Sequence, residues 1–405
     1  MLEQCALKMP EILLPGEKCD LTKWAVVACD QFTSQPDYWR RVQETVGGAP
    51  SALNLIYPEA WLGEGDARIA RINDAMRDYE RNVLARRFAG FVLVERAVSA
   101  GKRLGLIAAV DLEKYDFSRG STSLIRPTEG TILERIPPRV RIREHAALEL
   151  PHILLLADDP GRTLIEPLWA RRDEFEKLYD FDLMESGGHI RGWRVGDEHA
   201  LDGALSGLLE KANGLLFAVG DGNHSLAAAR QCWLDIRRTL TPEQREDHPA
   251  RYALVELVNL ACPALVFEPI HRALFGVEPE ALIAEYRAYL AENGADEGEG
   301  DDLVAFDGAG RQWRFRSAQH PLRLLQGFLD GYMARRPAAR IDYIHGADAL
   351  RGLVDRPDAM GFMPRAFAKE ELFGYIRRFG ALPRKTFSMG EATEKRYYME
   401  ARAIR

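Results

Sequence analysis

The sequence predicts a mixed α/β (α+β) protein with mixed sheets. Short apolar runs bounded by turn residues indicate buried strands, and they alternate along the chain with longer stretches that have apolar residues at helical spacing. The length of 405 residues allows two or three domains. No internal repeat is present in the sequence.

The expected elements follow from these patterns in chain order. A short strand is expected at 24–30, a helix from Tyr38, and an amphipathic helix where acids are followed three or four residues later by arginines. Two strands joined by the turn SAGK come next, then a buried strand, a helix that ends at Asn213 and Gly214, and a further buried strand. The amphipathic helix covers 66–84, and the two strands joined by SAGK cover 88–98 and 102–113. The next buried strand covers 151–159, the helix that ends at Gly214 covers 201–214, and the last buried strand covers 215–219.

Changes in composition predict three regions. The stretch 291–310 is acidic and rich in glycine, which indicates an exposed loop or hairpin near a boundary at about residue 280. A second boundary is expected between 120 and 150. We therefore expect an N-terminal α/β region at 1–120, a core at 121–280 and a C-terminal α/β region at 281–405.

Charge and hydropathy exclude several classes of partner. The net charge is −7, with acidic and basic residues interspersed, so neither a nucleic-acid footprint nor a membrane-surface patch is expected. The longest apolar runs are too short to span a bilayer, and the first residues lack the pattern of a secretory signal, which predicts a cytoplasmic protein. The five cysteines are scattered and form no C-x-x-C pair. The sequence does not indicate an oligomeric state.

The segment GDGNHS, from Gly220 to Ser225, is the strongest candidate site. It lies between an apolar strand and an alanine-rich helix pattern, and a helix N-terminus favours an anion because its backbone N–H groups and macrodipole point there. Gly220 and Gly222 allow the backbone to approach a ligand, and Asn223 or Ser225 is expected to cap the helix.

The charged and ionisable members of this segment suggest chemistry with phosphate. Asp221 would repel a phosphate unless it held a metal ion or took a proton, and His224 could donate to a phosphate oxygen or move a proton. The alternative is a tight turn in which Asp221 makes an Asx-type hydrogen bond and His224 is exposed.

Four motifs resemble a known family. GDGNHSLAAA is similar to the D-G-H-H-R signature of the ParB-like fold, which includes sulfiredoxin and the free serine kinases, and to the D-G-H-H-R-Y-x-x-A segment of the bacterial and archaeal family DUF1015. The other three motifs, in the order expected for that family, are RPTEGT (126–131), EPIHRALF (268–275) and LPRKTFSMGEATEKRYYMEAR (382–402).

The resemblance implies a ParB-like core that binds a nucleotide and a phosphotransferase activity on a small hydroxyl substrate. Serine is nominated because genes of the family often neighbour serine-biosynthesis genes and because the motif is like that of the serine kinases. Mg²⁺ with ATP or ADP would be the cofactors, and a small molecule the partner. Fold alone does not settle function.

The chain departs from the family pattern at three positions. Asn223 stands in place of the first histidine of the signature, Ser225 in place of the arginine, and Thr128 in place of the histidine of R-P-H-E. Losing that arginine removes a bidentate phosphate donor, so either another base supplies the charge or nucleotide binding is weak or absent. The candidates are Arg384 and Lys385, which lie in a turn-like segment close to Ser388.

Two further motifs contribute candidate residues. Arg126 and Glu129 could form a plain salt bridge, or Glu129 could face Asp221 so that the two carboxylates share a magnesium ion or act as a general base. His271 and Arg272 follow a proline on an expected strand-to-helix turn, where they could bind phosphate or be structural.

Two other functions remain open at this point. A metal-dependent phosphoester hydrolase would use Asp221, His224 and His271 as ligands and would cleave phosphoserine without nucleotide. A non-catalytic protein would bind a nucleotide or an amino acid and turn nothing over. The sequence contains neither a Walker A motif nor a Rossmann glycine motif.

Overall fold

The computed structural model describes residues 1–293, 298–316 and 321–405 and shows a mixed α/β protein, as predicted. The chain divides into two compact units, which are described separately. The first unit comprises Met1–Val266, Ile376–Gly380 and Gly390–Arg405, and the second comprises Phe267–Tyr375 and Ala381–Met389.

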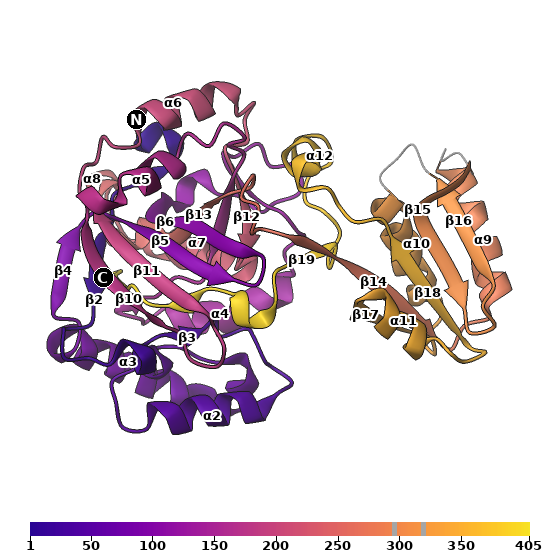
Figure 1. Ribbon diagram of the computed structural model, residues 1–405, viewed down its shortest axis with the longest axis horizontal. Coiled ribbons are helices and arrows are strands. Elements are labelled where there is room, and N and C mark those ends of the chain that lie inside the picture. The colour runs from indigo at the N-terminus through magenta and orange to yellow at the C-terminus, as the bar shows by residue number, and fades with distance from the viewer. Residues whose placement is uncertain (294–297, 317–320) are drawn as a thin grey trace. The chain divides into compact units, whose positions relative to one another are not determined.

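A nine-stranded mixed sheet forms the centre of the first unit (Figure 1). The pairs β13·β9 and β12·β7 are parallel and the other pairs are antiparallel. The predicted hairpin around SAGK is confirmed as β5 and β6. The strand order is β10 (Glu176–Asp182), β11 (His189–Val195), β5 (Phe91–Val98), β6 (Gly101–Asp111), β13 (Tyr252–Asn259), β9 (Leu154–Ala157), β12 (Phe217–Asp221) and β7 (Ile125–Pro127), with β1 (Leu7–Lys8) paired to β6.

The predicted regions 1–120 and 121–280 both contribute strands to this one sheet. The division of the chain into these three regions stays a prediction. The expected helices are confirmed at α2, α3 and α6, and α6 is followed by two residues with positive φ, Asn213 and Gly214. The helices from the N-terminus to residue 246 are α1 (Leu21–Trp24), α2 (Pro36–Val46), α3 (Gly65–Asn82), α4 (Ile136–Arg143), α5 (Glu166–Ala170), α6 (Asp202–Lys211), α7 (Asn223–Arg237) and α8 (Pro242–Glu246).

The last residues of the chain join the first unit through short strand pairs. β20 (Tyr397–Tyr398) pairs with β3 (Val26–Val27). Of the strand expected at 24–30, only these two residues of β3 are in a strand. β21 (Arg402–Ala403) pairs with β8 (Leu148–Glu149), and β2 (Glu11–Leu14) pairs with β4 (Arg86–Ala89). The pairs β20·β3 and β21·β8 bring the C-terminal tail beside segments that lie far from it in sequence.

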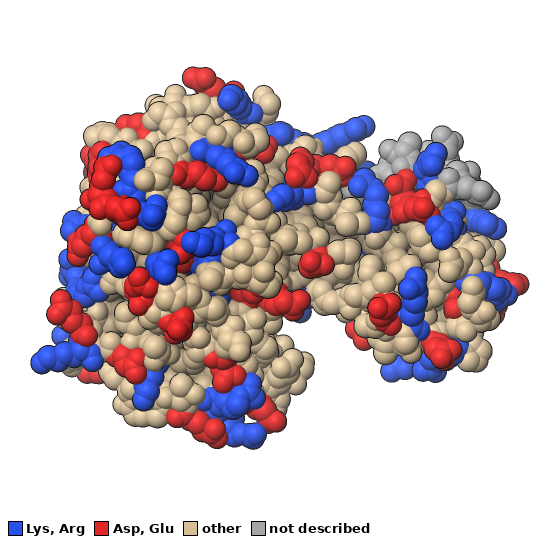
Figure 2. All heavy atoms as spheres, in the orientation of Figure 1, with Lys and Arg blue, Asp and Glu red and all other residues tan. Residues whose placement is uncertain are grey.

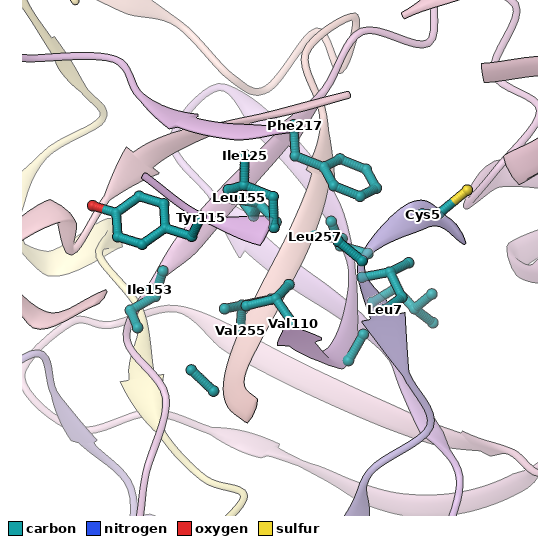
Figure 3. Close-up of a cluster of buried hydrophobic side chains, with 14 of the residues drawn as sticks. Cys5, Leu7, Val110, Tyr115, Ile125, Ile153, Leu155, Phe217, Val255 and Leu257 are labelled. Carbon is teal, nitrogen blue, oxygen red and sulfur yellow. The ribbon is translucent and has the colours of Figure 1, made fainter. Parts of the chain in front are cut away.

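Apolar side chains of the central strands form the core of the first unit (Figure 3). Ile125, Leu155, Phe217 and Leu257 come from four different strands and are buried together. Each large side chain buried in this way contributes about 1.5–3 kcal/mol relative to exposure. The apolar face of α7 packs against the same core, and this packing holds the helix in position.

A six-stranded antiparallel sheet forms the second unit. The stretch 291–310, predicted to be an exposed loop or hairpin, contains the end of α9, β15 and the turn that leads to β16. It is part of a hairpin, but Leu303 and Ala305 in it are buried, and residues 294–297 lie outside the described part. The strands are β16 (Gln312–Arg316), β15 (Gly298–Asp307), β18 (Ala359–Pro364), β14 (Phe267–Phe275) and β17 (Arg340–His345), with β19 (Phe387–Met389) paired to β14, and the remaining helices of the chain are α9 (Pro279–Glu292), α10 (Pro321–Arg335), α11 (Ala347–Leu353) and α12 (Leu372–Phe379).

Two observations bear on the surface. Figure 2 shows acidic and basic side chains interspersed over the face of the first unit that it presents. Among the described residues, no helix is both long enough and apolar enough to cross a bilayer.

Candidate functional site

The GDGNHS segment is a strand-to-helix loop, as predicted. β12 ends at Asp221, Gly222 turns the chain with φ of +76°, and α7 begins at Asn223. A Cβ atom on Gly222 would lie 2.9 Å from Ile153 Cγ1 and 3.0 Å from Ile153 Cα. Both the backbone conformation and the space therefore require glycine at this position.

The first turn of α7 has no side-chain cap. Gly222 is the N-cap residue, so the prediction that Asn223 or Ser225 caps the helix was wrong. Both residues lie inside the first turn because the helix starts immediately after the glycine. The backbone N–H groups of a helix start that no side chain caps, together with the positive end of the macrodipole, favour an anionic ligand.

Asp221 is held as a carboxylate by its neighbours. Lys395 Nζ lies 3.2 Å from Asp221 Oδ2, and the Gly222 N–H donates to Oδ1 at 2.9 Å. Burial raises the pKa of this carboxyl, but Lys395, His152 and the Gly222 N–H lower it by more, so the pKa lies below its ordinary value. A carboxylate with a depressed pKa is a poor proton acceptor at neutral pH.

His224 is a neutral hydrogen-bond donor at neutral pH. Burial lowers its pKa to about 4, with the charges of Arg139 and Arg135 acting in the same direction. The Ile132 N–H donates to His224 Nε2 at 3.1 Å, so the ring proton is on Nδ1. His224 is therefore able to donate one hydrogen bond from Nδ1 but contributes no positive charge.

Ser225 belongs to a chain of hydrogen bonds that sequence reasoning missed. Its Oγ lies 3.0 Å from His152 Nε2, and His152 Nδ1 lies 2.7 Å from the hydroxyl oxygen of Tyr398. The Cys29 N–H donates to the same hydroxyl oxygen at 3.2 Å. The other three members of this chain come from the loop before β9, from β20 and from the turn after β3, so no local sequence pattern links them.

The edge strand β7 contains Arg126 and is followed two residues later by Glu129, and the guanidinium of Arg126 contacts Gly214, which precedes β12, and not the loop that follows it. Pro127 pairs with Val219 in parallel register, and Thr128 Oγ1 donates to the Val219 carbonyl at 2.8 Å. Arg126 is 9% exposed and donates to the carbonyls of Ser121 and Gly214 at 3.1 and 3.3 Å. Glu129 follows Pro127 by two residues, as Asp221 follows Val219, so the parallel register carries both to the same end of the two strands. Glu129 is half-buried.

Lys395 is a basic residue at this loop that the sequence did not nominate, and it forms an ion pair with Asp221. It belongs to the first unit, and it lies in the same C-terminal motif as the predicted Arg384 and Lys385 but ten residues beyond Lys385. The useful signal was the motif itself, LPRKTFSMGEATEKRYYMEAR, which contains all three basic residues. Nothing in the local pattern distinguishes Lys395 from the other two.

The remaining predicted residues belong to the second unit. His271 and Arg272 lie within the continuous strand β14, so the expected strand-to-helix turn was wrong. Arg272 is fully buried, and its guanidinium donates to the Ile270 carbonyl, to Gln326 Oε1 at 3.3 Å and to the Arg384 carbonyl at 3.3 Å.

The basic turn before β19 also belongs to the second unit. Arg384 pairs with Asp330 at 3.2 Å, Lys385 has φ of +59°, and Ser388 lies in β19. A ligand-binding role for these residues and for His271 and Arg272 stays a prediction.

Few side chains of the first unit are placed to coordinate a metal ion. Within the part of the chain that the structure describes, no three His, Cys, Asp or Glu side chains lie close enough together to hold a metal ion. Because Ile132 N–H occupies Nε2 of His224, a transition-metal site built on this histidine and Asp221 is disfavoured. Asp221 and Glu129 fit Mg²⁺ only in company with phosphate and water ligands, which is how Mg²⁺ is commonly bound.

Comparisons with solved structures give distant likenesses. A conserved hypothetical protein from Pyrococcus furiosus has a TM-score of 0.37 at 10% identity, covering 70% of this chain and 90% of that chain. A free serine kinase in complex with AMP has a TM-score of 0.41 at 10% identity, covering 74% and 92%. C-terminally truncated SbnI from Staphylococcus aureus has a TM-score of 0.37 at 11% identity, covering 70% and 82%. Likenesses of this degree assign no activity.

Comparison with curated proteins gives no match. The family comparison is decisive, because a family model described as a protein of unknown function (DUF1015) matches residues 13–340, which is most of the chain. The resemblance to this family is thereby confirmed, and three of the four motifs lie within the matched residues, whereas the motif at 382–402 lies beyond them. The chain belongs to the DUF1015 family.

Proposed function

We propose that the protein is a nucleotide-dependent phosphotransferase that acts on the hydroxyl group of a small molecule, with serine as the first candidate. The observation that carries the proposal is the uncapped start of α7, which has the ammonium of Lys395 and the imidazole of His224 in its surroundings. Backbone N–H groups at a helix start, a lysine and a neutral imidazole donor form a suitable set of partners for phosphate oxygens.

Each residue has a defined task in this proposal. The first turn of α7 binds the phosphates, His224 donates from Nδ1 to a phosphate oxygen, and Lys395 offsets charge that develops during transfer. Asp221 keeps Lys395 in place through their ion pair. Because the pKa of Asp221 is depressed, Glu129 is the better candidate for taking the proton of the acceptor hydroxyl.

A magnesium ion bound with ATP or ADP would neutralise phosphate charge, and Asp221 and Glu129 are the carboxylates that would hold it. The protein's own part of catalysis is then positioning and electrostatic stabilisation, which dominate phosphoryl transfer.

A phosphorus NMR time course tests this proposal. The protein with Mg²⁺ is incubated with ATP or ADP plus L-serine, and separately with phosphoserine alone. We expect a phosphoserine signal that requires nucleotide and that is lost in Asp221→Asn and Lys395→Met. The control variant is Lys8→Met, which removes an exposed ion pair with Asp247 of similar length, 2.8 Å, away from the loop.

Other results of that time course would contradict the proposal in different ways. Release of inorganic phosphate from phosphoserine without nucleotide indicates a hydrolase. A silent spectrum in every sample rejects serine as the acceptor. Nucleotide binding without turnover, and with affinity that Asp221→Asn changes, indicates a non-catalytic binding protein.

A further inference from the structure

The hydrogen-bonded chain through Ser225 has the arrangement of an activated nucleophile. In such arrangements a hydroxyl lies within hydrogen-bond reach of a histidine, and a third group holds the histidine ring in position. Here Ser225 Oγ lies 3.0 Å from His152 Nε2, and Tyr398 lies 2.7 Å from the other ring nitrogen. His152 is only 9% exposed, and each of its ring nitrogens contacts a protein hydroxyl, Nε2 that of Ser225 and Nδ1 that of Tyr398.

Tyr398 contacts the ring nitrogen of His152 that does not face Ser225. The Tyr398 oxygen lies 2.7 Å from His152 Nδ1 and accepts the Cys29 N–H at 3.2 Å. In the tautomer that has its proton on Nδ1, His152 donates to the Tyr398 oxygen. The lone pair of Nε2 is then directed at Ser225, which is the orientation that a general base needs.

A cavity of about 150 Å³ opens beside this serine. Ser225, His152, Tyr398 and Cys29 all line it. The rest of its wall is mainly aliphatic and includes Leu55, Ile56, Met76, Leu148, Ile153 and Leu254. A cavity of this size holds a group about as large as benzene.

The charged side chains in the cavity wall all have partners of opposite charge. Arg139 pairs with Glu59, and Glu149 pairs with Arg143 at 2.5 Å and with Arg402 at 2.7 Å. Burial raises the pKa of the Cys29 thiol to about 12, so this thiol stays protonated and is a poor nucleophile. The wall therefore combines a mainly aliphatic lining with the hydroxyl of Ser225, which His152 contacts, and this suits a substrate with a small apolar group.

We propose that Ser225 is a catalytic nucleophile for esters of small apolar carboxylic acids, with the acyl group in this cavity. Ser225 Oγ attacks the carbonyl carbon while its proton passes to His152 Nε2. The bond to the leaving alcohol breaks, the alcohol takes the proton from His152, and an acyl-serine remains. Water then attacks the acyl carbon, gives its proton to His152 and releases the acid, and the proton returns to Ser225.

The position of Ser225 in the first turn of α7 adds a second element of such a site. The tetrahedral intermediate carries negative charge on oxygen, and the N–H groups of this uncapped turn are the nearest backbone donors in sequence. Tyr398 is a positioning residue, because it contacts His152 and not the reacting serine.

Hydrolysis of 4-nitrophenyl butyrate tests the proposal, with acylation of the intact chain followed by mass spectrometry. We expect a burst of one nitrophenolate per chain and a butyryl group on Ser225. Ser225→Ala should lower the rate to that of buffer, and His152→Gln should lower it at least about 100-fold. Ser206→Ala is the matched control, because Ser206 is a half-buried serine in the neighbouring helix α6 and should leave the rate unchanged.

Two more variants distinguish catalysis from folding. Ser225→Cys keeps a small nucleophile at the same place and should carry the butyryl group on residue 225. Tyr398→Phe removes the acceptor of His152 Nδ1–H, and it should lower the rate about 10-fold while the pH at half-maximal rate shifts. The ester 4-nitrophenyl dodecanoate, whose acyl chain exceeds the cavity, should react much more slowly than the butyrate.

A rate in wild type no higher than in buffer would overturn the proposal, as would an acyl group on another residue or full activity in Ser225→Ala. The assay contains no nucleotide and no phosphate ester. Failure of the phosphotransferase proposal would therefore leave its result unchanged, and the two proposals stand or fall separately.

Discussion

Two strands, β12 in the first unit and β14 in the second, contain or adjoin the polar residues that the sequence nominates for ligand binding. β12 stops at Asp221, and the glycine after it turns the chain so that His224 lies in the first turn of a helix. β14 continues without a break through His271 and Arg272. Both segments match family motifs, and both strands are followed by a helix, but only in the first do the nominated residues lie where the strand ends and the helix starts.

This difference shows what a motif match leaves undecided. Inside a strand, a side chain is enclosed by its cross-strand neighbours, and Arg272 makes its hydrogen bonds to groups of its own unit. Past a strand end, the backbone leaves the ladder and its N–H groups turn toward a possible ligand. The same residue types therefore serve packing in one place and are available for chemistry in the other.

The largest effect is expected from breaking the turn after β12. Gly222→Ala forces an alanine into a positive φ and brings its Cβ within 3.0 Å of Ile153, so we expect a loss of about 3–4 kcal/mol in the free energy of unfolding. Urea unfolding followed by circular dichroism measures it.

The matched control for that turn is Gly214→Ala. Gly214 also has a positive φ, +78°, but a Cβ there would meet nothing within 4 Å, so only the backbone strain of about 1 kcal/mol is expected. Equal losses in the two variants would show that Ile153 gives way and that the close approach at Gly222 is unimportant.

The second prediction addresses β14 directly. Arg272→Met leaves Gln326 Oε1 and the carbonyls of Ile270 and Arg384 without their donor, and we expect a loss of about 3 kcal/mol in unfolding free energy. Arg340→Met, at an exposed position in the neighbouring strand β17, should change stability by less than about 0.5 kcal/mol. Unchanged stability in Arg272→Met, combined with weaker nucleotide binding, would make Arg272 a ligand residue and reverse the comparison.

The sequence predicts the local part of the site and misses its long-range part. The apolar run of β12, the glycines and the helix pattern of α7 are contiguous, so the strand-to-helix loop is predictable from 215–240 alone. Lys395 reaches Asp221, and Tyr398 reaches His152, because β20 pairs with β3, which is more than 350 residues distant in sequence. Such pairing depends on which surfaces remain unburied after the main sheet forms, and no local periodicity encodes it.

His152 illustrates the same limit within a correctly predicted strand. The apolar pattern of PHILLLADD indicates β9, and its histidine is unremarkable in that pattern. It becomes a candidate base only because β9 lies beside β12, whose following helix contains Ser225. The order of strands in a sheet is set by packing among many segments, so this neighbour was outside the reach of sequence reasoning.

The smallest expected effect concerns pH and the neutral state of His224. The pKa of this imidazole is about 4 in the folded chain and 6.5 is its ordinary value, so the unfolded chain binds a proton first as the pH falls. Stability attributable to this residue is therefore full above pH 6.5 and declines between pH 6.5 and 4, by about 2 kcal/mol after allowance for partial exposure. His224→Gln keeps a hydrogen-bond acceptor for the Ile132 N–H but does not titrate, and it should flatten this part of the curve. Urea unfolding at pH 7.0, 5.5 and 4.5 measures the slope. An equal slope in wild type and variant would show that His224 is protonated as easily in the folded chain as in the unfolded one, and it would then bring a positive charge to the start of α7 instead of a neutral donor.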